Sequence, residues 1–213
     1  MYTDTEGIIL KQIKIAGGRR MIVLLSEKYG MISAGTSIPE KGKNKSSLAL
    51  RPFTRGRYEL YKNRDSYNIN GAETLQSFYS IGEDIDKYLA ASYVLELTER
   101  MLPEDEPMPG MYKLLRDFLV MLSSRKSEFE TVVIAFQVKA LALQGLALSQ
   151  NPLMNKESDG KIDIVRYIEN HPMSGLEGLS VEEKLRTSLS AYIKRYIFDN
   201  LGIGNLKSET FRI

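Results

Sequence analysis

The spacing of apolar residues changes once along the chain, near residue 74, and this change constrains the fold most. Before it, apolar residues form short runs that are rich in β-branched and aromatic side chains and are separated by Gly, Asn, Asp and Ser. That pattern is typical of a small antiparallel sheet or barrel. Beyond it, apolar residues recur at helical spacing. The sequence therefore predicts an α+β protein, with a β domain at residues 1–78 followed by an all-α domain at residues 79–213.

Five strands are expected in the first domain, each bounded by turn residues. They cover residues 6–14, 21–26, 31–36, 54–62 and 67–73. A long connection precedes the fourth strand, with one helical turn expected at residues 47–50, and this arrangement suits a five-stranded OB-type barrel. The period of two in the fourth strand places Arg55, Arg57, Glu59 and Tyr61 on one face.

Helices are expected throughout the second domain. The apolar stripes cover residues 81–102, 111–122 and 128–149, with a short helix near 162–168. The motif Ser180-Val181-Glu182-Glu183 has the form of a capping box that opens a last helix, and Gly202 is a suitable stop for it. Residues 151–180 are the least regular stretch.

Composition excludes several kinds of protein. The chain has 213 residues, 43% of them apolar, with no cysteine and a single histidine, His171. Disulfides are excluded and a zinc site is not expected, because thiolate and imidazole ligands are lacking. The acidic N-terminus does not resemble a signal peptide, and the most apolar stretch, Val132 to Leu148, is too short to span a bilayer comfortably. We expect a cytoplasmic protein without a metal, a cofactor or a membrane segment.

Charge is distributed unevenly along the chain. The formal net charge of +2 divides into +6 for residues 1–80 and −4 for residues 81–213. A basic N-terminal part is common in proteins that bind nucleic acids, because Lys and Arg neutralise phosphates and release counterions. The alternative is a solvated surface without a partner. The basic candidates for DNA contact are Arg19, Arg20, Lys41, Lys43, Lys45, Arg51, Arg55 and Arg57. Tyr61 could stack on a base or pack against the barrel.

No arrangement of residues predicts an active site. A nucleophile needs a base within hydrogen-bond reach, and His171 lies before a proline in an expected turn. The acidic run Glu104-Asp105-Glu106 lies between prolines, where a solvated loop is a simpler interpretation than a magnesium site. We therefore expect a protein that is not an enzyme.

Several segments, in the same order, resemble the RecO family of bacterial recombination mediators. They are Thr5-Glu6-Gly7-Ile8-Ile9-Leu10, Tyr29-Gly30-Met31-Ile32-Ser33-Ala34, Pro52-Phe53, Ala90-Ala91-Ser92-Tyr93-Val94-Leu95-Glu96-Leu97 and Leu201-Gly202-Ile203-Gly204-Asn205-Leu206-Lys207-Ser208. Many members carry a four-cysteine zinc module between the long helices and the C-terminal helices. The corresponding residues 151–180 contain no cysteine, so this module is either metal-free or lost.

The resemblance implies a non-catalytic protein that binds single- and double-stranded DNA and anneals complementary strands. It also implies three protein partners: RecR, the acidic C-terminal tail of single-stranded-DNA-binding protein and, indirectly, RecA. A basic residue after a helical Phe helps to receive that tail in the family, and Phe136 with Lys139 matches this arrangement, although Ile134-Ala135 lacks the basic residues often found there. The alternative is an interaction scaffold whose basic barrel contacts an acidic protein surface.

Overall fold

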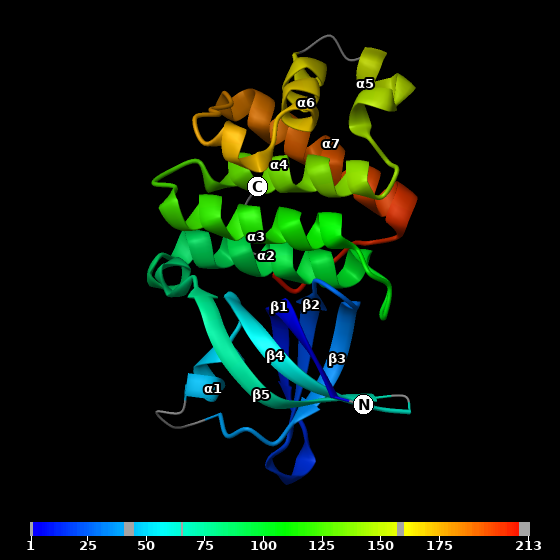
Figure 1. Ribbon diagram of the computed structural model, residues 1–213. Coiled ribbons are helices and arrows are strands. Elements are labelled where there is room, and N and C mark those ends of the chain that lie inside the picture. The colour runs from blue at the N-terminus through cyan, green and yellow to red at the C-terminus, as the bar shows by residue number, and fades with distance from the viewer. Residues whose placement is uncertain (1, 41–44, 65, 157–159, 209–213) are drawn as a thin grey trace. The chain divides into compact units, whose positions relative to one another are not determined.

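A computed structural model describes residues 2–40, 45–64, 66–156 and 160–208 (Figure 1). The chain folds into two compact units. The first comprises residues 1–83 and 95–112, and the second comprises residues 84–94 and 113–213. The first unit contains the strands, and the second contains most of the helical residues. The predicted α+β class is confirmed.

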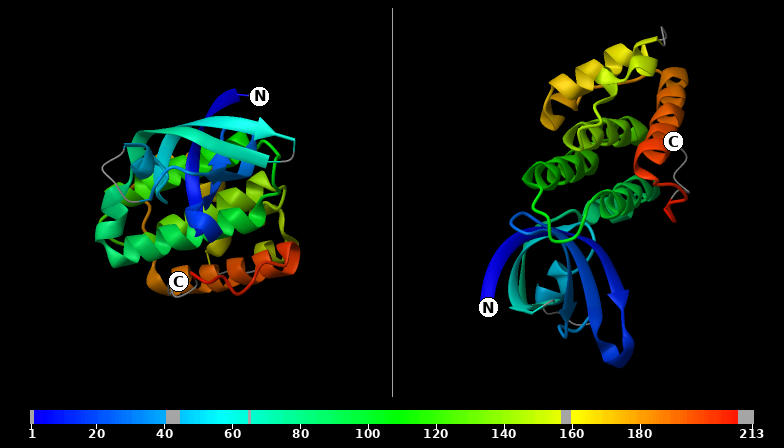
Figure 2. Two further views of the ribbon diagram at one scale, coloured as in Figure 1. Left: turned by 90° about the horizontal axis from the view of Figure 1, so that it is seen from below. Right: turned by 90° about the vertical axis from the view of Figure 1, so that its right-hand side faces the viewer.

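Five strands close into a barrel in the order β1-β2-β3-β5-β4. Their bounds are β1 (Tyr2–Lys14), β2 (Arg20–Ser26), β3 (Gly30–Thr36), β4 (Thr54–Asn63) and β5 (Ser66–Ser77). Neighbouring strands are antiparallel except for β3 and β5, which pair in parallel over Ala34–Thr36 and Tyr67–Ile69. Figure 2 shows the barrel from two further sides, with the β1–β2 hairpin extending from it. All five expected strands are present, and β1 and β5 are longer than expected because pairing continues past the apolar runs.

The barrel core follows the predicted alternation. In β4, Tyr58 and Leu60 are fully buried, whereas Arg57 and Glu59 are exposed. Packing around them are Ile9, Ile22, Leu24, Ile32, Ala34, Leu50, Tyr67 and Ile69. The short helix α1 (Lys45–Ala49) corresponds to the expected helical turn. The hydroxyl of Tyr58 donates a 2.8 Å hydrogen bond to the carbonyl oxygen of Ala49, which joins this helix to the barrel.

The second unit is built around α4 (Phe129–Leu143), which packs against α6 and α7. The other helices are α2 (Ile85–Met101), α3 (Pro109–Ser124), α5 (Pro152–Lys156), α6 (Lys161–Asn170) and α7 (Glu183–Leu201). α2 and α3 each contribute residues to both units. The rings of Phe118 and Phe136 meet edge-on with centroids 5.3 Å apart, as expected for helices that lie side by side (Figure 1). α4 is apolar on nearly all sides, which is typical of a helix that is buried all round.

Several helix boundaries differ from the prediction, among them the start of α2 at Ile85 rather than near residue 81. α4 ends at Leu143 rather than near residue 149, and Gly145 follows with a positive φ of 76°. α7 begins at Glu183, not at a Ser180 cap. The hydroxyl of Ser180 instead donates to Glu128 Oε1 at 2.8 Å, so a tertiary partner replaces the local capping bond. The stop at Gly202, with φ 66°, is confirmed.

Within the first unit, the segment that follows α2 lies directly against β3. The amide of Asp105 donates to the carbonyl oxygen of Met31 at 2.9 Å, and the hydroxyl of Ser33 donates to Glu104 Oε1 at 2.9 Å. Gly30 makes this approach possible. A Cβ atom at Gly30 would lie 1.9 Å from the carbonyl oxygen of Glu106, and its φ of 73° disfavours other residues.

Gly30→Ala should therefore destabilise the protein more than Gly17→Ala. Gly17 has nearly the same φ, 75°, but nothing lies within 4 Å of an added Cβ atom. Gly17→Ala should cost about 1–2 kcal/mol from backbone conformation alone. Gly30→Ala should cost at least about 1 kcal/mol more, because the loop must shift and weaken its hydrogen bonds to β3. Urea unfolding of both variants measures the difference, and equal losses would contradict the close packing at Gly30.

Candidate nucleic-acid interface

The predicted DNA-binding residues of the barrel fall into exposed and internally paired groups. Arg19, Lys45, Arg51 and Arg57 are exposed. Lys41 and Lys43 lie outside the described residues, so their predicted contact with DNA stays a prediction. Arg19 and Arg51 come from different connections, after the 3₁₀ turn Ala16–Gly18 and after α1. The exposed cations thus come from two connections, from α1 (Lys45) and from β4 (Arg57).

Arg20 does not belong to this surface. Its residue is only 4% exposed, and its guanidinium donates a hydrogen bond to the carbonyl oxygen of Ile38. Arg20 therefore ties the chain that leaves β3 to the start of β2. The residue that opens β2 is covered when the barrel closes, and the predicted contact of Arg20 with phosphate stays a prediction.

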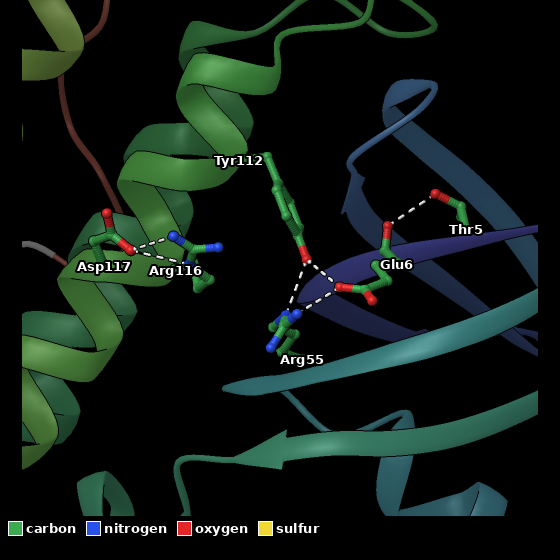
Figure 3. A network of polar contacts seen from close by, with 6 residues as sticks. All are labelled: Thr5, Glu6, Arg55, Tyr112, Arg116 and Asp117. Atoms are coloured by element: carbon green, nitrogen blue, oxygen red, sulfur yellow. Dashed lines mark hydrogen bonds and ion pairs between the residues drawn. The ribbon is translucent and has the colours of Figure 1, made fainter.

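Arg55 is held in a cluster with Glu6 and Tyr112 (Figure 3). Its Nη2 atom lies 2.6 Å from Glu6 Oε2, and its Nε atom donates to the Tyr112 hydroxyl at 3.2 Å. The hydrogen bond to Tyr112 raises the pKa of Arg55, and partial burial raises the pKa of the Tyr112 hydroxyl. Arg55 is therefore a charged residue that joins β4, β1 and the start of α3, and its charge is already compensated.

Strand pairing also surrounds Arg57 with carboxylates. Glu6 of β1 and Glu73 of β5 lie directly opposite it on its two neighbouring strands. Opposite charges in such cross-strand positions attract one another. Asp4 and Glu59 form the next pair along β1 and β4. The face of β4 that the sequence predicts to be basic is therefore mixed, with more carboxylates than cations.

Arg19 lies beside β3. A Cβ atom at Gly35 would be 4.0 Å from Arg19 Nη2, which places the guanidinium over this residue. Near the same end of the β1–β2 hairpin, Lys14 Nζ lies 3.0 Å from Glu40 Oε2. That ion pair is exposed, so it contributes little to stability. Arg19 is thus a cation that reaches across the outside of the barrel.

Tyr61 contacts an aromatic residue that sequence reasoning missed. Its ring centroid lies 4.9 Å from that of Tyr2, with 52° between the ring planes, and the two residues are opposite each other in β4 and β1. The prediction left open whether Tyr61 packs or stacks. It is half-buried on the outer face against Tyr2. The sequence gives no signal for this pair, because only barrel closure brings β1 beside β4.

The predicted partner-tail residues do not form a shared surface. Phe136 is fully buried and belongs to the core, and its predicted contact with a tail stays a prediction. Lys139, one turn further along α4, is half-buried. Burial lowers the pKa of Lys139, and the nearby carboxylate of Glu169 partly offsets this effect. Lys139 is the one predicted tail contact that keeps some exposure.

The stretch that replaces the zinc module is more helical than predicted. It contains α5, α6 and the 3₁₀ turn Met173–Leu176. Within the described residues, no three His, Cys, Asp or Glu side chains gather as they would around a metal ion. None of the helices in the described ranges combines the length and the apolar character needed to cross a membrane.

The closed barrel followed by helices defines the class of protein as an OB-fold domain with a helical domain. Residues 1–78 match the family model described as recombination protein O N terminal, and residues 82–152 match the one described as recombination protein O C terminal. The chain therefore belongs to the RecO family.

Relatives named DNA repair protein RecO support this assignment. The protein from Alkaliphilus metalliredigens is 26% identical over 239 residues, covering 98% of this chain and 97% of the relative. The one from Acetivibrio thermocellus is 23% identical, covering 94% and 92%. The one from Desulforudis audaxviator is 30% identical over 142 residues, covering 67% of this chain and 56% of the relative.

Arg55→Gln and Arg57→Gln should separate structural from exposed arginines. Arg55→Gln should lower the free energy of unfolding by about 1–3 kcal/mol, because it removes a charged hydrogen bond and leaves Glu6 without its partner. Arg57→Gln should change it by less than about 0.5 kcal/mol, as for most exposed residues. Chemical denaturation measures both. Equal effects of the two variants would contradict the structural role of the Arg55 cluster.

Lys139→Met should raise the melting temperature at pH 7, because it removes a partly buried charge and retains an apolar side chain. The folded-state pKa of Lys139 lies below its usual 10.5. At neutral pH the side chain is charged in both states, so its partial burial lowers the free energy of unfolding by the full amount. This cost disappears as the pH rises through that pKa. The advantage of the variant should therefore shrink in thermal unfolding as the pH rises toward 10.5, the usual pKa of a lysine side chain. The exposed Lys126→Met is the control, and a pH-independent difference would contradict this explanation.

Proposed function

We propose that the chain is a non-catalytic recombination mediator in DNA repair, which binds single- and double-stranded DNA and anneals complementary strands. The observation that carries this proposal is the closed barrel, matched over residues 1–78 by the N-terminal family model. OB-type barrels commonly bind oligonucleotides. The relatives' name, DNA repair protein RecO, supports the same role.

The exposed cations supply the electrostatic part of the proposed interface. Arg19 extends from the β1–β2 hairpin, Lys45 begins α1, and Arg51 follows that helix. Contacts of this kind neutralise phosphates without reading sequence. They therefore suit a protein that must bind any single strand and its complement. Arg20 and Arg55 take no part, because the barrel uses both internally.

Annealing requires that two polyanions be held together and their repulsion reduced. Cations on separate turns of the barrel could contact two strands at once, which is a physical reason to assign annealing to this domain. No bond needs to be made or broken in that process, so the proposal includes no catalytic residue. Family resemblance adds RecR, the acidic tail of single-stranded-DNA-binding protein and, indirectly, RecA as proposed partners.

Binding to a single-stranded oligonucleotide should depend strongly on salt. If about four to six phosphates are neutralised, log K should fall against log salt with a slope of about −3 to −4. Fluorescence anisotropy at several salt concentrations measures the slope. A slope near zero would contradict the electrostatic interface, and no complex even at low salt would favour an interaction scaffold that does not need DNA.

The same experiment on a variant with Lys41, Lys43 and Lys45 replaced by Ala tests the predicted basic loop. The slope should become shallower by up to about 2 units, since each lost contact removes released counterions. Annealing should fall more than single-strand binding. A variant with Lys126, Lys184 and Arg195 replaced by Ala removes three exposed charges from the second unit and is the matched control. Equal slopes for the two variants would remove the loop from the interface.

A further inference from the structure

Tyr2 and Tyr61 present aromatic surface on the outside of the barrel. Tyr2 is 73% exposed, which is unusual for a large side chain held in a paired strand. Its ring lies against that of Tyr61 with centroids 4.9 Å apart. The two ring planes are tilted by 52°, and Tyr61 is half-buried, so the exposed ring of Tyr2 supplies most of the accessible aromatic surface.

This pair belongs to a continuous row across four strands. Tyr2 lies opposite Tyr61, Tyr61 opposite Asn68, and Asn68 opposite Gly35. Arg19 covers the far end of the row, over Gly35. At the usual spacing between strands, the row from β1 to β3 is about 14 Å long when followed along the curved sheet. The barrel therefore places two aromatic rings, an amide and a guanidinium in one row around its outside.

Further cations lie around the aromatic end of the row. Lys28 Nζ donates to the carbonyl oxygen of Asp4 at 2.9 Å, close to the start of β1. Lys62 and Arg64 follow Tyr61 at the β4–β5 turn, and both are exposed. Lys62 Nζ also donates to the Tyr67 hydroxyl at 2.9 Å and lies 4.8 Å from the centre of that ring. Lys62 follows Tyr61 in β4, so its side chain leaves the opposite face of the strand, and its charge is directed at Tyr67.

Carboxylates also lie beside the tyrosine pair. Asp4 and Glu59 form the next row, directly beside Tyr2 and Tyr61. The carboxylate of Glu59 leans over Gly71, where an added Cβ atom would lie 2.5 Å from Glu59 Oε2. These charges repel phosphates. The phosphates of a bound strand are therefore attracted to the exposed cations Arg19, Lys28 and Arg64 and not to this row.

We propose that Tyr2 and Tyr61 stack on an unpaired base of single-stranded DNA while these cations contact its phosphates. The proposal rests on the DNA binding proposed above and adds a preference for unpaired bases. Aromatic side chains combined with nearby cations bind single strands without sequence preference, because every base has a face on which a ring can stack. In a duplex the bases are stacked on one another, so this surface offers them no comparable contact.

A tryptophan at position 2 tests base stacking directly. The chain has no tryptophan, so Tyr2→Trp introduces a single indole reporter. Its fluorescence should be quenched by single-stranded oligothymidylate and should change little with a blunt duplex or with heparin, a polyanion without bases. Equal quenching by heparin would overturn the stacking proposal, because charge alone would then explain the signal.

Alanine and phenylalanine variants give the energetic test. Tyr2→Ala and Tyr61→Ala should each weaken binding of oligothymidylate by about 5- to 150-fold, with much smaller effects on duplex binding. Tyr2→Phe and Tyr61→Phe retain the ring and should bind almost like the original protein. Asp4→Asn with Glu59→Gln should strengthen binding, since it removes the neighbouring negative charges.

The outcomes separate this proposal from the proposed function. If the original protein binds no DNA at low salt, both are wrong. If it binds DNA but the alanine variants bind equally well, with unchanged melting temperatures, the tyrosine surface is excluded and the proposed function remains. A loss that is equal for single strands and duplexes would also overturn the preference for unpaired bases.

Discussion

Closure of the barrel is the constraint on which the rest of the first unit depends. β1 pairs with β2 along one edge and with β4 along the other, so its register is fixed from both sides. A slip of one residue would reverse which side chains face the core, and Ile9, Tyr58 and Leu60 could then no longer be buried together. This closure removes the free edges of the sheet and sets every cross-strand neighbour on the outer surface.

Those neighbours determine which charges are available to a ligand. Arg55 is paired with Glu6 and Arg20 is buried, so neither offers a free charge to a ligand. Both nevertheless contribute to the basic charge calculated from the sequence. Arg57 remains exposed but lies between carboxylates on the adjacent strands. The cations suited to phosphate are therefore those on turns, such as Arg19 and Arg51, where strand pairing imposes no opposite charge.

In the second unit, the surroundings of α4 have a similar effect. Helices pack on several sides of it, so the apolar residues along its length become core rather than a surface for a partner. Phe136 is buried against Phe118, whereas Lys139 keeps partial exposure close to Glu169. A motif of Phe followed by a basic residue is thus divided between core and surface by its helical neighbours, which spacing along one helix does not reveal.

The sequence by itself determined the order of elements, because strand and helix periods are local properties of the chain. The alternation in β4, the helical turn at α1 and the stop of α7 at Gly202 follow from such local patterns. Only the tertiary structure decided the Arg55 cluster, the Tyr2–Tyr61 pair and the tertiary bond of Ser180. Each joins residues that are at least 49 positions apart along the chain, and their proximity depends on strand register and helix packing, which no local period encodes.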